Sequence, residues 1–122
     1  MQRKTRRTGR VLKIYIAAPY TADTLEEREA NVARAVEVAV RLLEKGYAVY
    51  VPHLLHFIDL KAKEMGVYFP ESLWINIGLK ELSGCDTILI LGVSPGVERE
   101  RQFALQNGIP VYFGKKRRVG NG

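Results

Sequence analysis

The chain has 122 residues and a formal net charge of +6, and its apolar and charged fractions are those of one globular domain. No apolar run approaches the roughly 20 residues of a membrane helix, so we expect no membrane partner. The basic start is not followed by a signal-type apolar segment, and the lone cysteine, Cys85, excludes an internal disulfide. A cytoplasmic location is therefore the expectation.

The positive charge is concentrated at the two ends of the chain. Nine of the 19 basic residues lie before residue 11 or after residue 114, which leaves ten basic against 13 acidic residues in the body. Charge runs of this kind are typical of solvated tails, and they can also contact the phosphates of nucleic acid or a neighbouring subunit. We expect one domain over residues 11–114 between basic disordered tails at 1–10 and 115–122, with nucleic acid as a partner of the tails only.

The first half of the chain predicts two strands around a long helix. Val11–Ala18 is apolar enough for a central strand, and Asp23 or Thr24 caps a helix that runs to about Lys45. A second strand follows over Tyr47–Val51. Apolar positions at helical spacing predict the buried face of the helix: Val32, Ala35, Val36, Ala39, Val40 and Leu43.

The second half continues the alternation of strands and helices. It predicts, in order, helices over Leu54–Met65 and from about Pro70 to Leu82, a buried strand over Thr87–Leu91, a helix that begins after Ser94, and a last strand over Ile109–Phe113. This order is typical of a Rossmann- or flavodoxin-like three-layer α/β/α sandwich with a four- or five-stranded, mostly parallel sheet. In such sheets ligands bind beyond the carboxyl ends of the central strands, here Ala17–Tyr20 and Gly92–Gly96.

Glu100 is the residue near these ends whose placement is least expected of a surface helix. It shares one helical face with Val97 and Ala104, whereas Arg99 points elsewhere. A carboxylate that is poorly solvated there is a usable nucleophile. Tyr15 lies in the first strand, and its hydroxyl can orient Glu100 if the side chain projects toward the same side.

The turn before Glu100 offers groups that hold an anion. Ser94, Gly96 and the free backbone N–H groups of a helix N-terminus can bind a phosphate or a hydroxyl. The residues alone leave a structural interpretation open, in which Ser94 is only a cap. In that interpretation Glu100 is an ion-pair partner of Arg28 or Arg101.

Six segments in order resemble the nucleoside 2-deoxyribosyltransferase superfamily, including its 2'-deoxynucleoside 5'-phosphate N-hydrolase branch. They span most of Lys13–Phe113 and read KIYIAAPY, NVARA, GYAVYVPH, CDTILIL, SPGVERE and NGIPV. The resemblance implies that Glu100 attacks the anomeric carbon of a deoxyribosyl group and that Tyr15 supports it. It also implies that Ser94 and Gly96 help to hold the sugar or 5'-phosphate. A nucleoside or nucleotide substrate, no metal or cofactor, and a homo-oligomer follow from the same resemblance.

The loop after the first strand departs from many relatives, which have glycine-proline or glycine-serine where this chain has Ala18-Pro19-Tyr20. Tyr20 can stack on a base or be a half-exposed turn aromatic. Arg28 can reach a phosphate or pair with a neighbouring glutamate. We count all four residues among the candidates for substrate binding.

The spacing of His53, His56 and Asp59 also raises the question of a metal site. Successive steps of three residues rotate around a helix, so the first and last of these side chains diverge by about 120°. The chain has no further histidine. We therefore predict no metal site.

The largest departure from the family concerns proton delivery to the leaving base. The family carries a general-acid aspartate eight residues before the aspartate that opens the third strand, and this position is Gly78 here. Loss of a general acid costs about 10²–10⁴-fold in rate. Three interpretations stay open: a slow enzyme, an enzyme that uses another acid such as Glu81 or Asp59, or a nucleotide-binding module without catalysis. The main prediction is cleavage or transfer of the N-glycosidic bond of a 2'-deoxynucleoside or its 5'-monophosphate through Glu100.

Overall fold

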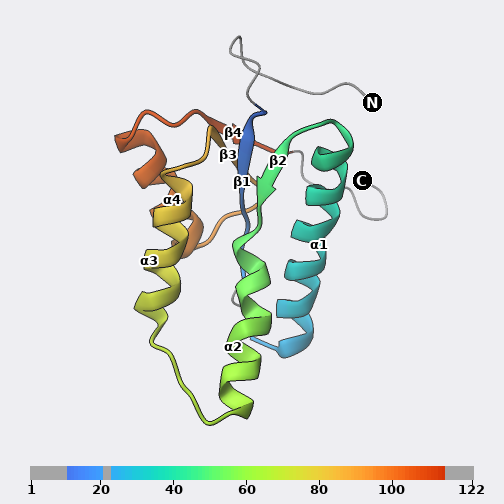
Figure 1. The fold of residues 1–122 in the computed structure, drawn as a ribbon, viewed down its shortest axis with the longest axis vertical. Helices are drawn as coiled ribbons and strands as arrows, with labels where there is room; N and C mark the ends of the chain where they lie inside the picture. Colours follow the sequence, from blue (N-terminus) through green and yellow to red (C-terminus); the bar gives the residue numbers. More distant parts are fainter. Residues whose placement is uncertain (1–10, 21–22, 115–122) are drawn as a thin grey trace.

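The computed structural model describes residues 11–20 and 23–114 of the chain. These residues form a four-stranded parallel sheet with helices on both of its faces (Figure 1). The predicted three-layer α/β/α fold is therefore confirmed. The basic tails predicted at 1–10 and 115–122 lie outside the described residues.

The sheet places its topological switch at its centre. The strands are β1 (Lys13–Ala17), β2 (Ala48–Tyr50), β3 (Thr87–Ile90) and β4 (Val111–Phe113). Their spatial order is β2-β1-β3-β4, and every neighbouring pair is parallel. The chain runs from β1 to β2 on one side and then returns to β3 on the other. The carboxyl ends of β1 and β3 are thus the edge at which such folds bind ligands.

Each face of the sheet carries its own hydrophobic cluster. The helical elements are α1 (Leu25–Glu44), the short 3-10 helix η1 (Pro52–Leu54), α2 (Leu55–Glu64), α3 (Glu71–Leu82) and α4 (Pro95–Gln106). Helix α1 covers one face, α3 and α4 cover the other, and α2 projects beyond the end of β2 (Figure 1). Among the described residues, no helix combines the length and apolarity needed to cross a bilayer.

Helix α1 starts at one of its two predicted caps, but its buried face is narrower than predicted. The Thr24 hydroxyl accepts a hydrogen bond from the backbone N–H of Glu27 at 3.1 Å, so Thr24 and not Asp23 is the cap. Val32, Ala35 and Ala39 are buried as expected. The prediction was wrong for three positions, which are 36–52% exposed: Val36, Val40 and Leu43. Helix α1 contacts the sheet along the line of Ala35 and Ala39, and these three residues lie beside that line.

Candidate active site

A cavity of about 400 Å³ opens at the carboxyl ends of β1 and β3. Its wall is formed by β1 and the loop after it, by η1 and α2, by α3, and by the first turns of α4. Small-molecule sites in proteins are typically about 300–1,000 Å³. The cavity therefore has room for a ligand the size of a nucleoside, at the edge that the topology predicts.

Tyr15 and Glu100 meet on the wall of this cavity. Tyr15 is completely buried in β1, and its side chain lies on the face that α3 and α4 cover. Its hydroxyl donates a hydrogen bond to Oε2 of Glu100 in α4, in a contact that joins residues 85 positions apart. The ring stacks on Tyr50 of β2, with 5.6 Å between the ring centroids. Both ends of the Tyr15 side chain are thus held in place.

The ion pair that the structural interpretation required is not formed. Arg101 pairs with Glu98 at 2.6 Å on the exposed side of α4. Glu100 faces inward instead, toward Tyr15. The helical spacing of Glu100 with buried Val97 and Ala104 explains this orientation, because the three residues share one face.

The surroundings of Glu100 keep its carboxyl poorly solvated. Burial raises the pKa of Glu100 to about 7, while the hydrogen bond from Tyr15 and the positive charge of Arg99 act in the opposite direction. Burial, followed by the nearby Glu100 charge, raises the pKa of Tyr15, so Tyr15 remains a phenol that donates a proton. With Oε2 bonded to Tyr15, Oε1 is the carboxylate oxygen left for reaction.

The first turn of α4 provides polar groups beside Glu100. The Ser94 hydroxyl accepts a hydrogen bond from the Val97 N–H at 3.1 Å and caps the helix, and both Ser94 and Gly96 line the cavity. Arg99 also lines the cavity, from an exposed position of α4 that does not share the face of Val97 and Glu100.

The opposite wall is built around Tyr20 and two buried histidines. The Tyr20 hydroxyl is hydrogen-bonded to Nδ1 of His56, and the two rings meet edge to face. Nε2 of His53 donates to the carbonyl oxygen of Ala18 at 2.9 Å, which anchors the loop after β1. Burial lowers the pKa of His53, so its ring stays neutral in this role. Within the described residues no group of three potential metal ligands is present.

Ala18 and Tyr20 line the cavity, but two other predicted binding residues do not. The ring of Pro19 packs against Gly92, where an added Cβ would lie 2.8 Å from Cδ of Pro19. Pro19 therefore packs the loop after β1 against the loop after β3. Arg28 lies outside the cavity wall. Burial raises the pKa of Tyr20, and the charge of Arg28 acts in the opposite direction without cancelling it.

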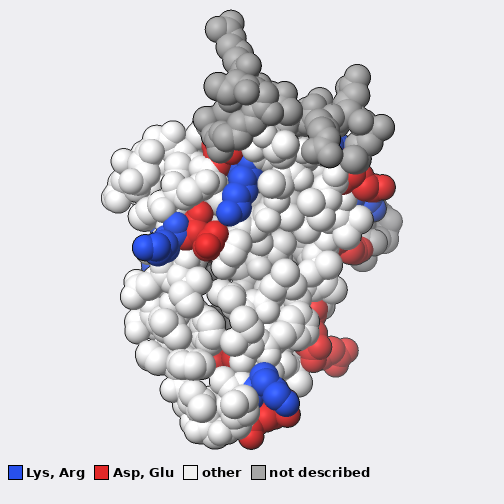
Figure 2. Space-filling model, in the orientation of Figure 1, with Lys and Arg blue, Asp and Glu red and all other residues white. Residues whose placement is uncertain are grey.

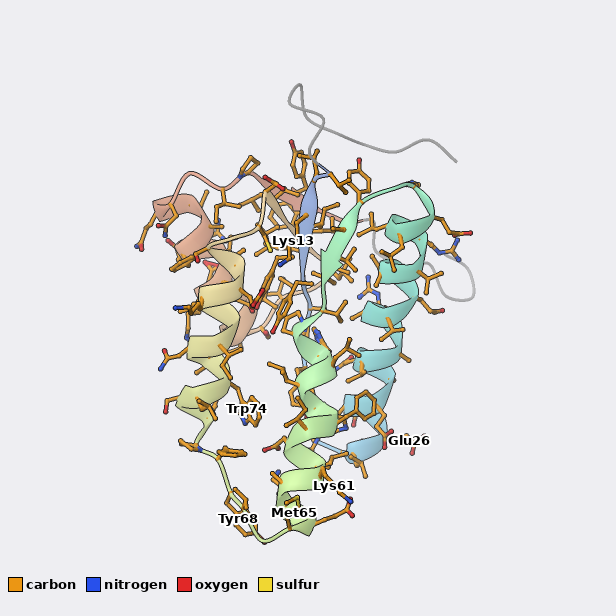
Figure 3. The ribbon with its side chains drawn as sticks, in the orientation of Figure 1. Lys13, Glu26, Lys61, Met65, Tyr68 and Trp74 are labelled. Carbon is orange, nitrogen blue, oxygen red and sulfur yellow. The ribbon has the colours of Figure 1, made fainter. Side chains whose placement is uncertain are left out.

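Helix α3 contributes residues that the sequence analysis did not assign to a site. Trp74 points from α3 toward α2 (Figure 3) and lines the cavity, four residues before Gly78 and on the same helical face. Of the two acids considered as replacements for the family's aspartate, Glu81 is hydrogen-bonded to Nζ of Lys13 at 3.3 Å and is not on the cavity wall. Asp59 of α2 is on the wall.

Comparisons with known proteins agree with this architecture. The model of the family described as Domain of unknown function (DUF7768) matches residues 12–114. A solved structure of a 2-deoxyribosyltransferase from the psychrotolerant bacterium Bacillus psychrosaccharolyticus is similar, with a TM-score of 0.58 and 20% sequence identity, and the match covers 89% of this chain and 77% of that one. At this identity the likeness shows the fold. The comparison with curated proteins found no match.

Proposed function

The chain belongs to the family described as Domain of unknown function (DUF7768), and we propose that it cleaves or transfers the N-glycosidic bond of a 2'-deoxynucleoside or its 5'-monophosphate. One observation carries the proposal: the desolvated carboxyl of Glu100, hydrogen-bonded by Tyr15, on the wall of a cavity of nucleoside size. The shared fold with a 2-deoxyribosyltransferase supports the choice of substrate class.

The first step is displacement of the base by Glu100. Oε1 attacks the anomeric carbon, a C–O bond forms, and the C–N bond breaks with its electron pair going to the base nitrogen. An acid on the wall gives that nitrogen a proton. The hydrogen bond from Tyr15 to Oε2 fixes the direction from which Oε1 approaches the sugar.

The second step releases the sugar from Glu100. A water molecule or a second base attacks the anomeric carbon, and the C–O bond to Glu100 breaks with its electrons returning to the carboxylate. The attacking group passes its proton to the conjugate base of the wall acid, which restores the starting state. Water as acceptor makes the protein a hydrolase, and a base makes it a transferase.

Asp59 is the proton donor in this proposal. Of the two acids that the sequence suggested, only Asp59 lies on the cavity wall. Its carboxyl is 19% exposed and lies 3.0 Å from Nζ of Lys63. General-acid catalysis contributes about 10²–10⁴-fold, so its loss is readily measured.

The remaining wall residues divide between the two ends of the substrate. Ser94, Gly96 and Arg99 surround the N-terminus of α4 and suit a hydroxyl or a 5'-phosphate. Tyr20 and Trp74 provide aromatic surface on which a base can stack. In this proposal the nucleoside lies with its sugar at α4 and its base between the loop after β1 and α3.

Glu100→Gln tests the proposal. We expect the wild-type protein to release free base from a panel of deoxynucleosides and their monophosphates, measured by HPLC, and the variant to release none. Glu98→Gln is the matched control, because Glu98 lies on the exposed side of the same helix in an ion pair with Arg101. No release by the wild-type protein at high enzyme concentration, together with thermal stabilisation by a nucleotide, favours a binding module instead.

We also propose a homo-oligomer that forms through α2 and the loop after it. Large apolar side chains are 54–74% exposed there: Phe57, Ile58, Met65 and Tyr68. Figure 3 labels Met65 and Tyr68 at this end of the molecule. Figure 2 shows uncharged surface there beside a group of charged atoms, and the exposed Lys61–Glu64 ion pair lies on the same helix. Monomeric proteins rarely expose apolar patches of more than a few hundred Å². Ile58→Lys is expected to yield monomers in light scattering after size-exclusion chromatography, whereas Val40→Lys on equally exposed α1 surface leaves the mass unchanged.

A further inference from the structure

Gly78 lies in α3 at the point where this helix passes the Tyr15–Glu100 pair. The residue is buried and belongs to the cavity wall. A Cβ built on Gly78 would lie 2.9 Å from the Tyr15 hydroxyl oxygen and 3.9 Å from Oε2 of Glu100. Carbon and its non-bonded neighbours are in optimal contact near 3.5–4.0 Å, so the first of these distances is a clash.

Tyr15 has no room to yield to such a side chain. It is fully buried in the central strand, and its ring stacks on Tyr50. Its hydroxyl is committed to Glu100. The clashing atom is therefore the end of a rigid, doubly held side chain and not a flexible one. Glycine in mid-helix is also about 1 kcal/mol less favourable than alanine, so α3 carries a residue that its own stability disfavours.

We propose that Gly78 is a positioning residue, whose missing side chain provides the space in which the Tyr15 hydroxyl reaches the Glu100 carboxylate. The inference rests on the proposed function for its catalytic part. It also changes the meaning of the departure at this position. In this chain the volume of the missing side chain is used by the Tyr15 hydroxyl, so the glycine is part of how the site is built.

A consequence concerns the source of the proton for the leaving base. Gly78 carries no acid, and an added Cβ there would lie 2.9 Å from the Tyr15 hydroxyl oxygen. The proton donor is therefore sought elsewhere on the wall, where Asp59 of α2 and Glu71 of α3 also line the cavity. The proposed function assigns the role to Asp59.

Gly78→Ala, made in the wild-type chain and again in the Tyr15→Phe chain, tests the inference. In the wild-type chain the new methyl group displaces the hydroxyl, and misplacement of a catalytic group by about 1 Å costs about 10²-fold in kcat. The melting temperature is expected to fall as well. In the Tyr15→Phe chain the oxygen that the methyl group would clash with is gone, and Oε2 of Glu100 lies at an ordinary 3.9 Å, so Gly78→Ala is expected to change the rate much less and to raise the melting temperature.

Gly84→Ala is the matched control. An added Cβ there meets only the Glu81 carbonyl oxygen at 3.6 Å, an ordinary contact, so both rate and melting temperature should stay near the wild-type values. Equal effects of Gly78→Ala in the two backgrounds would overturn the inference. The melting temperatures separate it from the proposed function: if the wild-type protein releases no base but the background-dependent pattern is found, the positioning role stands and the proposed activity fails.

Discussion

The stability of the Glu100→Gln variant relative to the wild-type protein is expected to be higher at pH 8 than at pH 4.5. The carboxyl of Glu100 has a pKa of about 7 in the folded protein against an ordinary value of 4.5, because burial disfavours its charged form. Below pH 4.5 the group is protonated in both the folded and the unfolded chain, and it contributes nothing. Between pH 4.5 and 7 the unfolded chain releases the proton while the folded chain retains it, so wild-type stability falls as the pH rises.

The size of this effect follows from the shift itself. Each pKa unit corresponds to 1.36 kcal/mol, so a shift from 4.5 to about 7 lowers the free energy of unfolding by about 3 kcal/mol above pH 7. Glutamine does not titrate, yet its side-chain carbonyl still accepts the hydrogen bond from Tyr15. The stability difference between the variant and the wild-type protein should therefore grow by about 3 kcal/mol from pH 4.5 to pH 8, equal to roughly 10 °C in melting temperature for a domain of this size.

Urea unfolding of both proteins at pH 3.5, 4.5, 5.5, 6.5 and 8 measures this difference. Taking the difference cancels the contributions of every other titrating group that the two chains share. The curve should be flat below pH 4.5, rise through the window, and level off above pH 7. A difference that does not change with pH would show that the Glu100 carboxylate is well solvated, and the argument for a desolvated nucleophile would fail.

Three further predictions concern activity. Base release, measured as kcat/KM, should fall at both low and high pH, because Glu100 must be ionised to attack and the proton donor on the wall must be protonated; one of the two limbs should have its midpoint near pH 7, and a rate that is flat from pH 4 to 9 would contradict this. Tyr15→Phe removes a hydrogen bond that lowers the pKa of Glu100, so the midpoint of the limb near pH 7 should move to higher pH and the rate should drop, and an unmoved midpoint would argue against the pairing. Arg99→Gln should raise KM for a deoxynucleoside 5'-monophosphate by about tenfold while leaving KM for the nucleoside nearly unchanged, since a phosphate contact is worth about 1.4 kcal/mol or more; equal effects on both would place Arg99 away from the phosphate.

The meeting of Tyr15 with the α4 turn was predictable because parallel α/β topology leaves little choice. An apolar run, a turn and a capped helix predict where β3 ends and α4 begins, and the order of elements places that end beside β1. Alternation along β1 then decides the face, since Tyr15 and Ala17 share one side and Ile16 takes the other. Glu100 follows from its helical spacing with Val97.

The sequence was less informative wherever side-chain direction depended on a neighbouring element. Arg99 borders the cavity because α2 and α3 enclose the space next to α4. The sequence of α4 alone does not show where those two helices lie. Pro19 turned toward Gly92 because two loops cross there. The outer positions of α1, such as Val40, fit the apolar period equally well, and only the line of contact with the sheet decided which were buried.

Gly78 illustrates a different limit, because comparison with a family pattern reports which side chain is missing and not what occupies its volume. The structure gives that volume to the Tyr15 hydroxyl, beside a carboxylate whose burial costs about 3 kcal/mol above pH 7. Domains of this size have a total stability of only about 5–15 kcal/mol, so this cost and that of a mid-helix glycine are substantial. Two destabilising residues that converge on one hydroxyl are hard to explain by folding alone. Their convergence at the mouth of a cavity is what chemistry at Glu100 requires, since a carboxylate that water stabilises fully is a poor nucleophile.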